Sequence, residues 1–224
     1  MIESFPDETA LAAAACAATV GALSAGLAAR GHASLIGTGG RSPAPVYDAL
    51  SVAGLDWGRV TVSLSDDRFV PATSPDSNER LVRERLLRGA AAAATFLPLH
   101  ASVPTPDAAA DLAEPHLRAL APFDMLFLGM GEDGHIASLI PGSPVMAAGL
   151  DLTGDRFVIG VPAGVGSPPI ARVSLTLRAL LQARATLVLI RGAVKRQIVE
   201  AGSGLPVHAF LKQAKAPVRV LWTP

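Results

Sequence analysis

The sequence predicts an α/β fold, in which helices cover both faces of a mostly parallel sheet and give three layers. Half of the 224 residues are apolar, enough for one chain to bury a substantial core. Short apolar runs alternate with longer helical patterns, and nearly continuous apolar strands are typical of parallel sheets. No long linker, repeat or low-complexity segment divides the chain, so residues 1–224 are expected to form a single domain.

The first element is an uncharged run from Thr9 to Ala29, which is predicted to be a helix packed against the sheet. Asp7 is its expected N-cap, and Arg30 with Gly31 supplies the stop. The preceding segment MIESFPDE is acidic, which argues against a signal peptide, and small residues give too little transfer energy for a membrane span. We therefore expect a cytoplasmic protein with no membrane partner.

The rest of the chain supplies eight candidate strands and five candidate helices. The strands are ASLIG at 33, RVTVSLS at 59, TFLPL at 95, FDMLFLG at 123, RFVIGV at 156, ARVSLT at 171, TLVLI at 186 and PVRVLW at 217. The helices are predicted over 43–52, 76–88, 107–120, 192–201 and 206–212. In a parallel sheet, ligands bind beyond the carboxyl ends of the strands, so polar strand ends are candidate sites.

The first such strand end reads GTGGRSP, with Ser42 as the expected N-cap and Pro43 as the first helical residue. Gly39 and Gly40 would let a phosphate approach the backbone N–H groups of the helix start, and Arg41 adds a full positive charge. The pattern matches neither nucleotide-binding glycine motif, so a nucleotide is not indicated. A tight turn without a ligand remains the alternative.

The second strand end reads SDDRFVP. Asp66 and Asp67 are expected to form a local ion pair with Arg68 and to orient its guanidinium toward a bound oxyanion. A solvated turn would produce the same pattern.

The third strand end, GMGEDGHIASLIPGS, places His135 in a glycine-rich loop after a buried strand. Histidine titrates near neutrality and can take a proton from water, and either Asp133 or Glu132 could fix its tautomer. The alternative is a structural histidine, with Asp133 as a helix cap.

The fourth strand end reads RGAVK and places Lys195 in the first turn of a helix, where its ammonium could reach a phosphate. Arg172, at the start of RVSLT, is a weaker candidate for the same role.

The overall composition excludes several functions. Nineteen basic residues balance nineteen acidic ones, so no global field attracts nucleic acid. Five histidines without recognisable ligand spacing argue against a metal site. The single cysteine, Cys16, cannot form an intramolecular disulfide, which fits a reducing compartment.

Taken in order, GTGGRSP, SDDRFVP with the later SN, GMGEDGHIASLIPGS, RVSLTLRALL and RGAVK resemble the 6-phosphogluconolactonase family over roughly residues 37 to 200. That family hydrolyses the δ-lactone of 6-phosphogluconate in the pentose phosphate pathway. The resemblance implies a Rossmann-like fold shared with glucosamine-6-phosphate deaminase, no nucleotide cofactor, no required metal and a monomer.

The resemblance also implies roles for the candidate residues. His135 would activate water, and Asp66, Arg68 and Asp133 would line the reacting end of the pocket. The substrate phosphate would be held by Gly39, Gly40, Arg41, Ser42 and Lys195, together with Arg172.

Some positions depart from the family pattern. Arg41 stands where many relatives have Ser or Thr, Ile140 where phenylalanine is frequent, and the sequence ends at VLWTP without a small acidic tail.

Two alternative functions remain. The first is deamination or isomerisation of a sugar phosphate on the same fold, but the related deaminases read GHIAFNEPG, and GHIASLIPG has no glutamate in that stretch. A sugar-phosphate sensor without turnover would have no need of His135.

Overall fold

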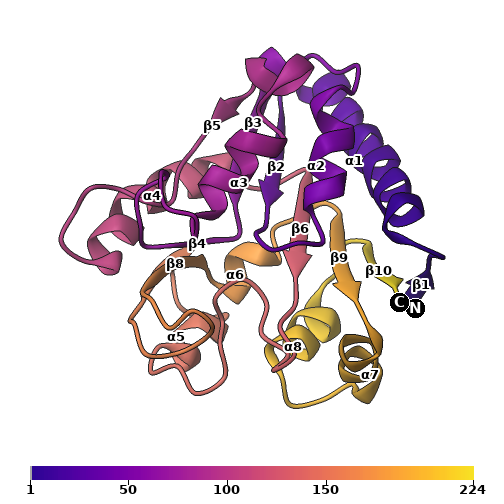
Figure 1. Ribbon diagram of the computed structural model, residues 1–224. Helices are drawn as coiled ribbons and strands as arrows, with labels where there is room; N and C mark the ends of the chain where they lie inside the picture. Colours follow the sequence, from indigo (N-terminus) through magenta and orange to yellow (C-terminus); the bar gives the residue numbers. More distant parts are fainter. Residues whose placement is uncertain (1) are drawn as a thin grey trace.

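The computed structural model describes residues 2–224, and its centre is a seven-stranded, entirely parallel sheet (Figure 1). The strand order is β1-β10-β9-β6-β2-β3-β5. The strands are β1 (Ile2–Ser4), β2 (Ala33–Gly37), β3 (Val60–Leu64), β5 (Thr95–Phe96), β6 (Met125–Gly129), β9 (Thr186–Arg191) and β10 (Val218–Thr223). The mostly parallel α/β sandwich expected from the sequence is confirmed.

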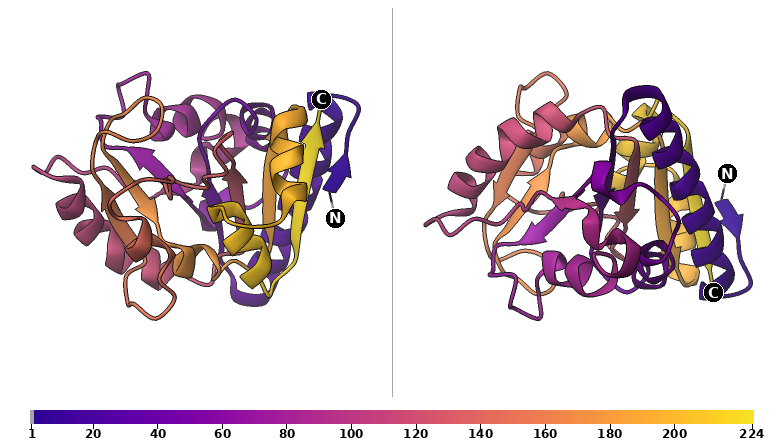
Figure 2. Two further views of the ribbon diagram at one scale, coloured as in Figure 1. Left: turned by 90° about the horizontal axis from the view of Figure 1, so that it is seen from below. Right: turned by 90° about the horizontal axis from the view of Figure 1, so that it is seen from above.

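Helices cover both faces of this sheet because its crossovers run in two directions. The chain crosses the sheet toward the β5 edge as it passes from β1 to β2, β3 and β5. It then crosses back toward the β1 edge as it passes from β5 to β6, β9 and β10. Right-handed crossovers therefore place the early helices and the late helices on opposite faces. Figure 2 shows α1 on one side of β9 and β10, and α7 and α8 on the other. The helices are α1 (Glu8–Arg30), α2 (Ala44–Ser51), α3 (Asn78–Arg85), α4 (Pro106–Leu120), α5 (Met146–Leu150), α6 (Leu177–Leu180), α7 (Ala193–Ala201) and α8 (Pro206–Gln213).

The long helix α1 begins and ends as its sequence predicts. The Asp7 carboxylate accepts a hydrogen bond from the backbone N–H of Ala10, and Gly31 ends the helix in the left-handed conformation. Within residues 2–224, α1 alone is long and apolar enough to cross a membrane by length and composition. Leu11, Ala15 and Leu23 are nonetheless buried, and the helix contacts β2, β10 and α2. It therefore packs against the sheet.

Two predicted strands do not join the parallel sheet. The segments predicted over 156–161 and 171–176 form β7 (Val158–Val161) and β8 (Arg172–Leu175), which pair antiparallel in a separate sheet with β4 (Asp66–Arg68). The sequence predicts a loop where β4 lies and gives no signal for β1. β7 and β8 are buried throughout, as a parallel strand would be, so their apolar pattern does not reveal their direction.

The start of α2 also differs from its prediction by one residue. The helix begins at Ala44 with Pro43 in the cap position, and no side chain caps it. Ser42 is therefore not the N-cap and stays in the turn that precedes the helix. Ser42 therefore belongs to the glycine-rich loop after β2 and not to α2.

The topology marks one crevice as the place for a ligand. β2 and β6 are neighbours, but the chain leaves β2 toward β3 on one side and leaves β6 toward β9 on the other. Loops that diverge in this way open a crevice beyond the carboxyl ends of the two strands. Residues 38–43 follow β2, and the glycine-rich loop that ends at His135 follows β6.

Candidate active site

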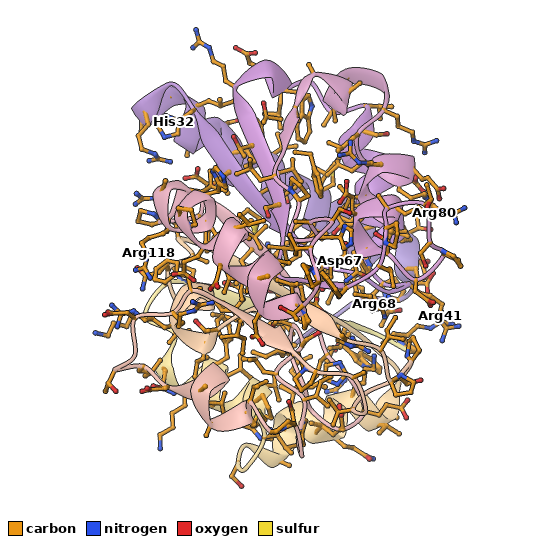
Figure 3. All side chains as sticks on the ribbon, turned by 90° about the vertical axis from the view of Figure 1, so that its left-hand side faces the viewer. His32, Arg41, Asp67, Arg68, Arg80 and Arg118 are labelled. Carbon is orange, nitrogen blue, oxygen red and sulfur yellow. The ribbon has the colours of Figure 1, made fainter. Side chains whose placement is uncertain are left out.

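A cavity of about 220 Å³ lies at this crevice and brings together segments from across the chain. Of the ten residues to which the family resemblance gave roles, nine line this cavity, and Asp133 does not. Figure 3 shows Arg41 and Arg68 on the same side of the molecule, with Arg118 and His32 on the opposite side. The lining consists of Thr38, Gly39, Gly40, Arg41, Ser42, Pro43, Asp66, Arg68, Asn78, Gly129, Met130, Gly131, His135, Ala137, Arg172, Leu189 and Lys195.

The loop after β2 is shaped by its glycines and held by Tyr47. The backbone N–H of Thr38 donates to the Tyr47 hydroxyl at 2.8 Å, and that hydroxyl donates to the Thr38 carbonyl at 2.7 Å. A Cβ atom at Gly39 would lie 1.9 Å from Oδ1 of Asn78, so only glycine fits there. Gly40 has φ 92°, a conformation that favours glycine. The loop can therefore bring backbone N–H groups close to an anion.

Arg68 does not form the ion pair expected with its two neighbouring carboxylates. Its Nη1 atom donates to the Asp76 carbonyl at 2.6 Å and lies 3.3 Å from Oδ1 of Asn78. No ion pair links it to Asp66 or Asp67 within residues 2–224. In the extended backbone of β4, Asp67 points to the opposite face from Arg68. Asp66 shares a face with Arg68, but its carboxylate accepts a hydrogen bond from Ser138 instead.

Arg68 instead faces Arg172 across the small antiparallel sheet, where the two residues are paired in register. Like charges opposite each other on two strands destabilise a sheet. The Nε atoms of both arginines are buried, and neither has a hydrogen-bond partner among the described residues. Burial lowers the pKa of Arg172, while the nearby Asp66 raises it. This arrangement would be stabilised by an anion in the cavity.

Asp67 does not line the cavity, and its carboxylate binds the start of α3 instead. Its carboxylate accepts hydrogen bonds from the backbone N–H groups of Asn78 at 2.6 Å and Glu79 at 3.0 Å, and from the Ser77 hydroxyl at 3.2 Å. Burial raises the pKa of Asp67 to about 6, although these hydrogen bonds oppose the shift. Asp67 thereby fixes the start of α3 and the position of Asn78.

The loop after β6 holds His135 against one carboxylate. Nδ1 of His135 lies 2.5 Å from Oδ1 of Asp133, so Asp133 and not Glu132 is the partner of the ring. A Cβ atom at Gly131 would lie 2.3 Å from both Cε1 and Nδ1 of that ring. Glycine at 131 is thus required for this placement of the imidazole. The side chain of His135 is a quarter exposed, at 25 %.

Lys195 reaches the same cavity from the first turn of α7. Burial lowers the pKa of its ammonium, Glu132 and Asp133 raise it, and Arg41 lowers it. Lys195 and Arg41 are therefore close enough to repel each other. Two cations so placed would favour a ligand with more than one negative charge.

Asn78, Ser138 and Thr38 are three polar residues of the site that sequence reasoning did not single out. Asn78 contacts Arg68 and donates to the Asp66 carbonyl at 2.9 Å. Ser138 donates to Oδ2 of Asp66 at 2.5 Å. All three fall inside the quoted motifs, but none has a local pattern that indicates its partner.

The structure shows no metal centre in residues 2–224, where no group of three His, Cys, Asp or Glu side chains is placed to hold an ion. The chemistry available at the cavity is that of a histidine–carboxylate pair, a buried aspartate and four basic side chains.

Comparison with known proteins places these features in a family. The family model described as "Glucosamine-6-phosphate isomerases/6-phosphogluconolactonase" matches residues 6–222. The chain belongs to this family. A family relative from Caulobacter vibrioides, named 6-phosphogluconolactonase, is 44% identical over 223 residues, which cover 99% of this chain and 96% of the relative.

Solved structures of the glucosamine-6-phosphate isomerase/6-phosphogluconolactonase family show the same fold. The crystal structure of a 6-phosphogluconolactonase from Shewanella baltica superimposes with a TM-score of 0.94 at 33% identity and covers 100% of this chain and 97% of that one. A monomeric glucosamine-6-phosphate deaminase has a TM-score of 0.81 at 16% identity over 99% of this chain and 96% of its own. The deaminase comparison establishes the shared fold alone.

Proposed function

We propose that this protein hydrolyses 6-phospho-D-glucono-1,5-lactone to 6-phosphogluconate, the lactonase step of the oxidative pentose phosphate pathway. The main observation behind the proposal is that a histidine–carboxylate pair and four basic side chains lie around one cavity. A phosphorylated lactone needs cations for its phosphate and a base for the attacking water. Nearly full-length relatives named 6-phosphogluconolactonase support the same reaction.

In the proposed mechanism, His135 is the general base. With Nδ1–H donating to Asp133, Nε2 is left as the acceptor that takes a proton from water. The water oxygen attacks the lactone carbonyl carbon, the bond from that carbon to the ring oxygen breaks, and the proton passes to the leaving ring oxygen. General-base assistance of this kind contributes ~10²–10⁴-fold in rate.

The basic residues serve the two ends of the substrate. Attack on the carbonyl creates an oxyanion, which the Arg68 guanidinium would stabilise. Gly39, Gly40 and Ser42 would hold the phosphate through the loop after β2, and the charged groups of Arg41, Lys195 and Arg172 would assist. The unpartnered Nε atoms of Arg68 and Arg172 support this assignment.

The same site does not favour deamination or isomerisation of a sugar phosphate. Ring-opening acid chemistry needs a carboxyl group beside the ring, and residues 138–140 are serine, leucine and isoleucine. Leu139 and Ile140 are both buried, and neither side chain can donate or accept a proton. A sensor without turnover would leave the geometry of His135 and Asp133 without a role.

We also propose that residues 1–224 act as one domain and as a cytoplasmic monomer. A continuous apolar core supports the single domain. A cavity formed by residues of one chain is compatible with a monomer. One half-buried cysteine is compatible with a reducing compartment.

The decisive experiment follows the loss of freshly prepared 6-phosphogluconolactone, corrected for spontaneous hydrolysis. The parent protein should accelerate it, and His135→Ala should lose most of this activity while still binding 6-phosphogluconate. Glucosamine 6-phosphate is the control substrate and should not be turned over. Absence of any acceleration by the parent protein would refute the proposed reaction, and unchanged turnover by His135→Ala would remove the histidine from it.

A further inference from the structure

The hydroxyl of Ser138 lies between two charged side chains of the cavity. It donates to Oδ2 of Asp66 at 2.5 Å, and Nη1 of Arg172 donates to it at 3.5 Å. All three residues are buried, with 1 % of Ser138, 5 % of Asp66 and 3 % of Arg172 exposed. Arg172 stays 3.9 Å from the same carboxylate oxygen, so the hydroxyl occupies the position between the charges.

The backbone around Ser138 is built to direct its side chain inward. Ala137 has φ 48°, the left-handed backbone conformation that residues other than glycine rarely adopt. The tight turn is closed by the Leu139 N–H, which donates to the Ile136 carbonyl at 3.0 Å. The N–H of Ser138 donates to the Ser174 hydroxyl of β8, also at 3.0 Å. An uncommon backbone conformation beside the cavity marks a position that the surrounding structure holds in place.

Asp66 depends on Ser138 more than on its other neighbours. Among residues 2–224, the one other side-chain hydrogen-bond donor to its carboxylate is Ser65, whose hydroxyl lies 3.4 Å from Oδ1, a long hydrogen bond. Arg172, in contrast, has an anchor of its own, because its Nη2 donates to the Pro168 carbonyl at 3.0 Å. Loss of the Ser138 hydroxyl would therefore free the Asp66 carboxylate and leave Arg172 largely in place.

We propose that Ser138 is a positioning residue, whose hydroxyl holds the Asp66 carboxylate at the reacting end of the cavity and keeps it apart from Arg172. The inference rests on the proposed lactonase function and deepens it. The deaminase pattern GHIAFNEPG has phenylalanine in place of Ser138, and phenylalanine cannot donate a hydrogen bond. The hydroxyl of Ser138 is therefore a chemical difference between this chain and the deaminase pattern.

The test compares Ser138→Ala and Ser138→Cys with the parent protein. Alanine removes the donor, and cysteine fills the space with only a weak donor. Both variants should lose about ten-fold or more in kcat, as expected for a hydrogen bond to a charged group. The dissociation constant for 6-phosphogluconate should change by no more than about two-fold, because no phosphate contact is removed.

The matched control is Ser63→Ala. Ser63 is also buried, but its hydroxyl donates to the Leu97 carbonyl at 2.9 Å, away from the cavity lining. Its kcat should equal that of the parent. The inference is overturned if either folded Ser138 variant keeps the parent kcat, or if kcat, product binding and melting temperature fall together. An inactive parent protein would instead refute the lactonase function itself, so the two failures are distinguishable.

Discussion

Asp133 holds His135 through two contacts on one carboxylate oxygen. Oδ1 of Asp133 lies 2.5 Å from Nδ1 of the His135 ring and accepts the backbone N–H of His135 at 3.2 Å. The first contact selects the tautomer and the second fixes the turn that presents the ring. The remaining ring nitrogen, Nε2, is the one available as a base.

Asp133→Asn should lower kcat by about ten-fold or more, because an amide can donate to Nδ1 and so favour the wrong tautomer. Binding of 6-phosphogluconate should change little. Steady-state kinetics with the lactone, corrected for spontaneous hydrolysis, gives the first quantity, and calorimetry gives the second. Asp56→Asn is the control, because this exposed carboxylate forms an ion pair with the neighbouring, equally exposed Arg59. An unchanged kcat in Asp133→Asn would show that the contact does not serve the reaction.

Gly131→Ala should reduce activity with little loss of stability. A Cβ atom at this position would lie 2.3 Å from the His135 ring, which must then move away from Asp133. The measurement is kcat together with the thermal midpoint. Gly54→Ala is the matched control, since a Cβ atom at Gly54 meets nothing within 4 Å. Equal activity of the two variants would contradict the requirement for glycine at 131.

Lys195→Ala should mainly raise KM for the phosphorylated lactone, by about ten-fold or more if the ammonium contacts the phosphate. Its kcat should stay close to that of the parent, because Lys195 is assigned to binding and not to the chemical step. Lys212→Ala, which removes an exposed lysine on α8, should leave both constants unchanged. A KM equal to that of the parent would exclude a phosphate contact by Lys195.

The affinity for 6-phosphogluconate should decline as the pH becomes alkaline. The decline should begin at a lower pH than it would if Lys195 had the pKa of an ordinary lysine. Burial lowers the pKa of Lys195, so its charge is present below that pKa and is lost as the pH rises through it. Calorimetric titration of the product against pH measures this. Lys195→Arg should move the decline to higher pH, because a guanidinium stays protonated. Identical pH curves for the two proteins would assign the decline to another group.

Asp67→Asn should destabilise the fold most at low pH. Burial raises the pKa of Asp67 to about 6, so the folded state binds the proton more tightly than the unfolded chain. The protonated carboxyl of Asp67 therefore adds up to about 3 kcal/mol to the free energy of unfolding. This stabilisation is complete below the ordinary aspartate pKa and is lost as the pH rises through 6. Urea unfolding of both proteins at pH 4 and pH 7 tests the sign. A larger loss at pH 7 would reverse the assignment.

Local sequence was sufficient for much of the fold and for nine of the candidate residues that line the cavity. The strand, glycine turn and helix around Gly39, and the strand and loop that lead to His135, are encoded within short stretches. Apolar runs and cap residues depend on neighbours in the chain, so they are visible before folding. Asp7 and Gly31, at the two ends of α1, are cases in which a single residue type specified the boundary correctly.

Only the tertiary structure decided which of these residues act on one another. Ser138 meets Asp66 across 72 positions of the chain, and Arg68 faces Arg172 because β4 and β8 pair antiparallel. A strand buried on both faces has the same apolar pattern in either direction, so neither pairing nor register could be deduced from it. The sequence by itself determined the groups at each strand end. Packing of distant segments determined the charges and hydrogen bonds among those groups, because such contacts form only when the separate segments pack together.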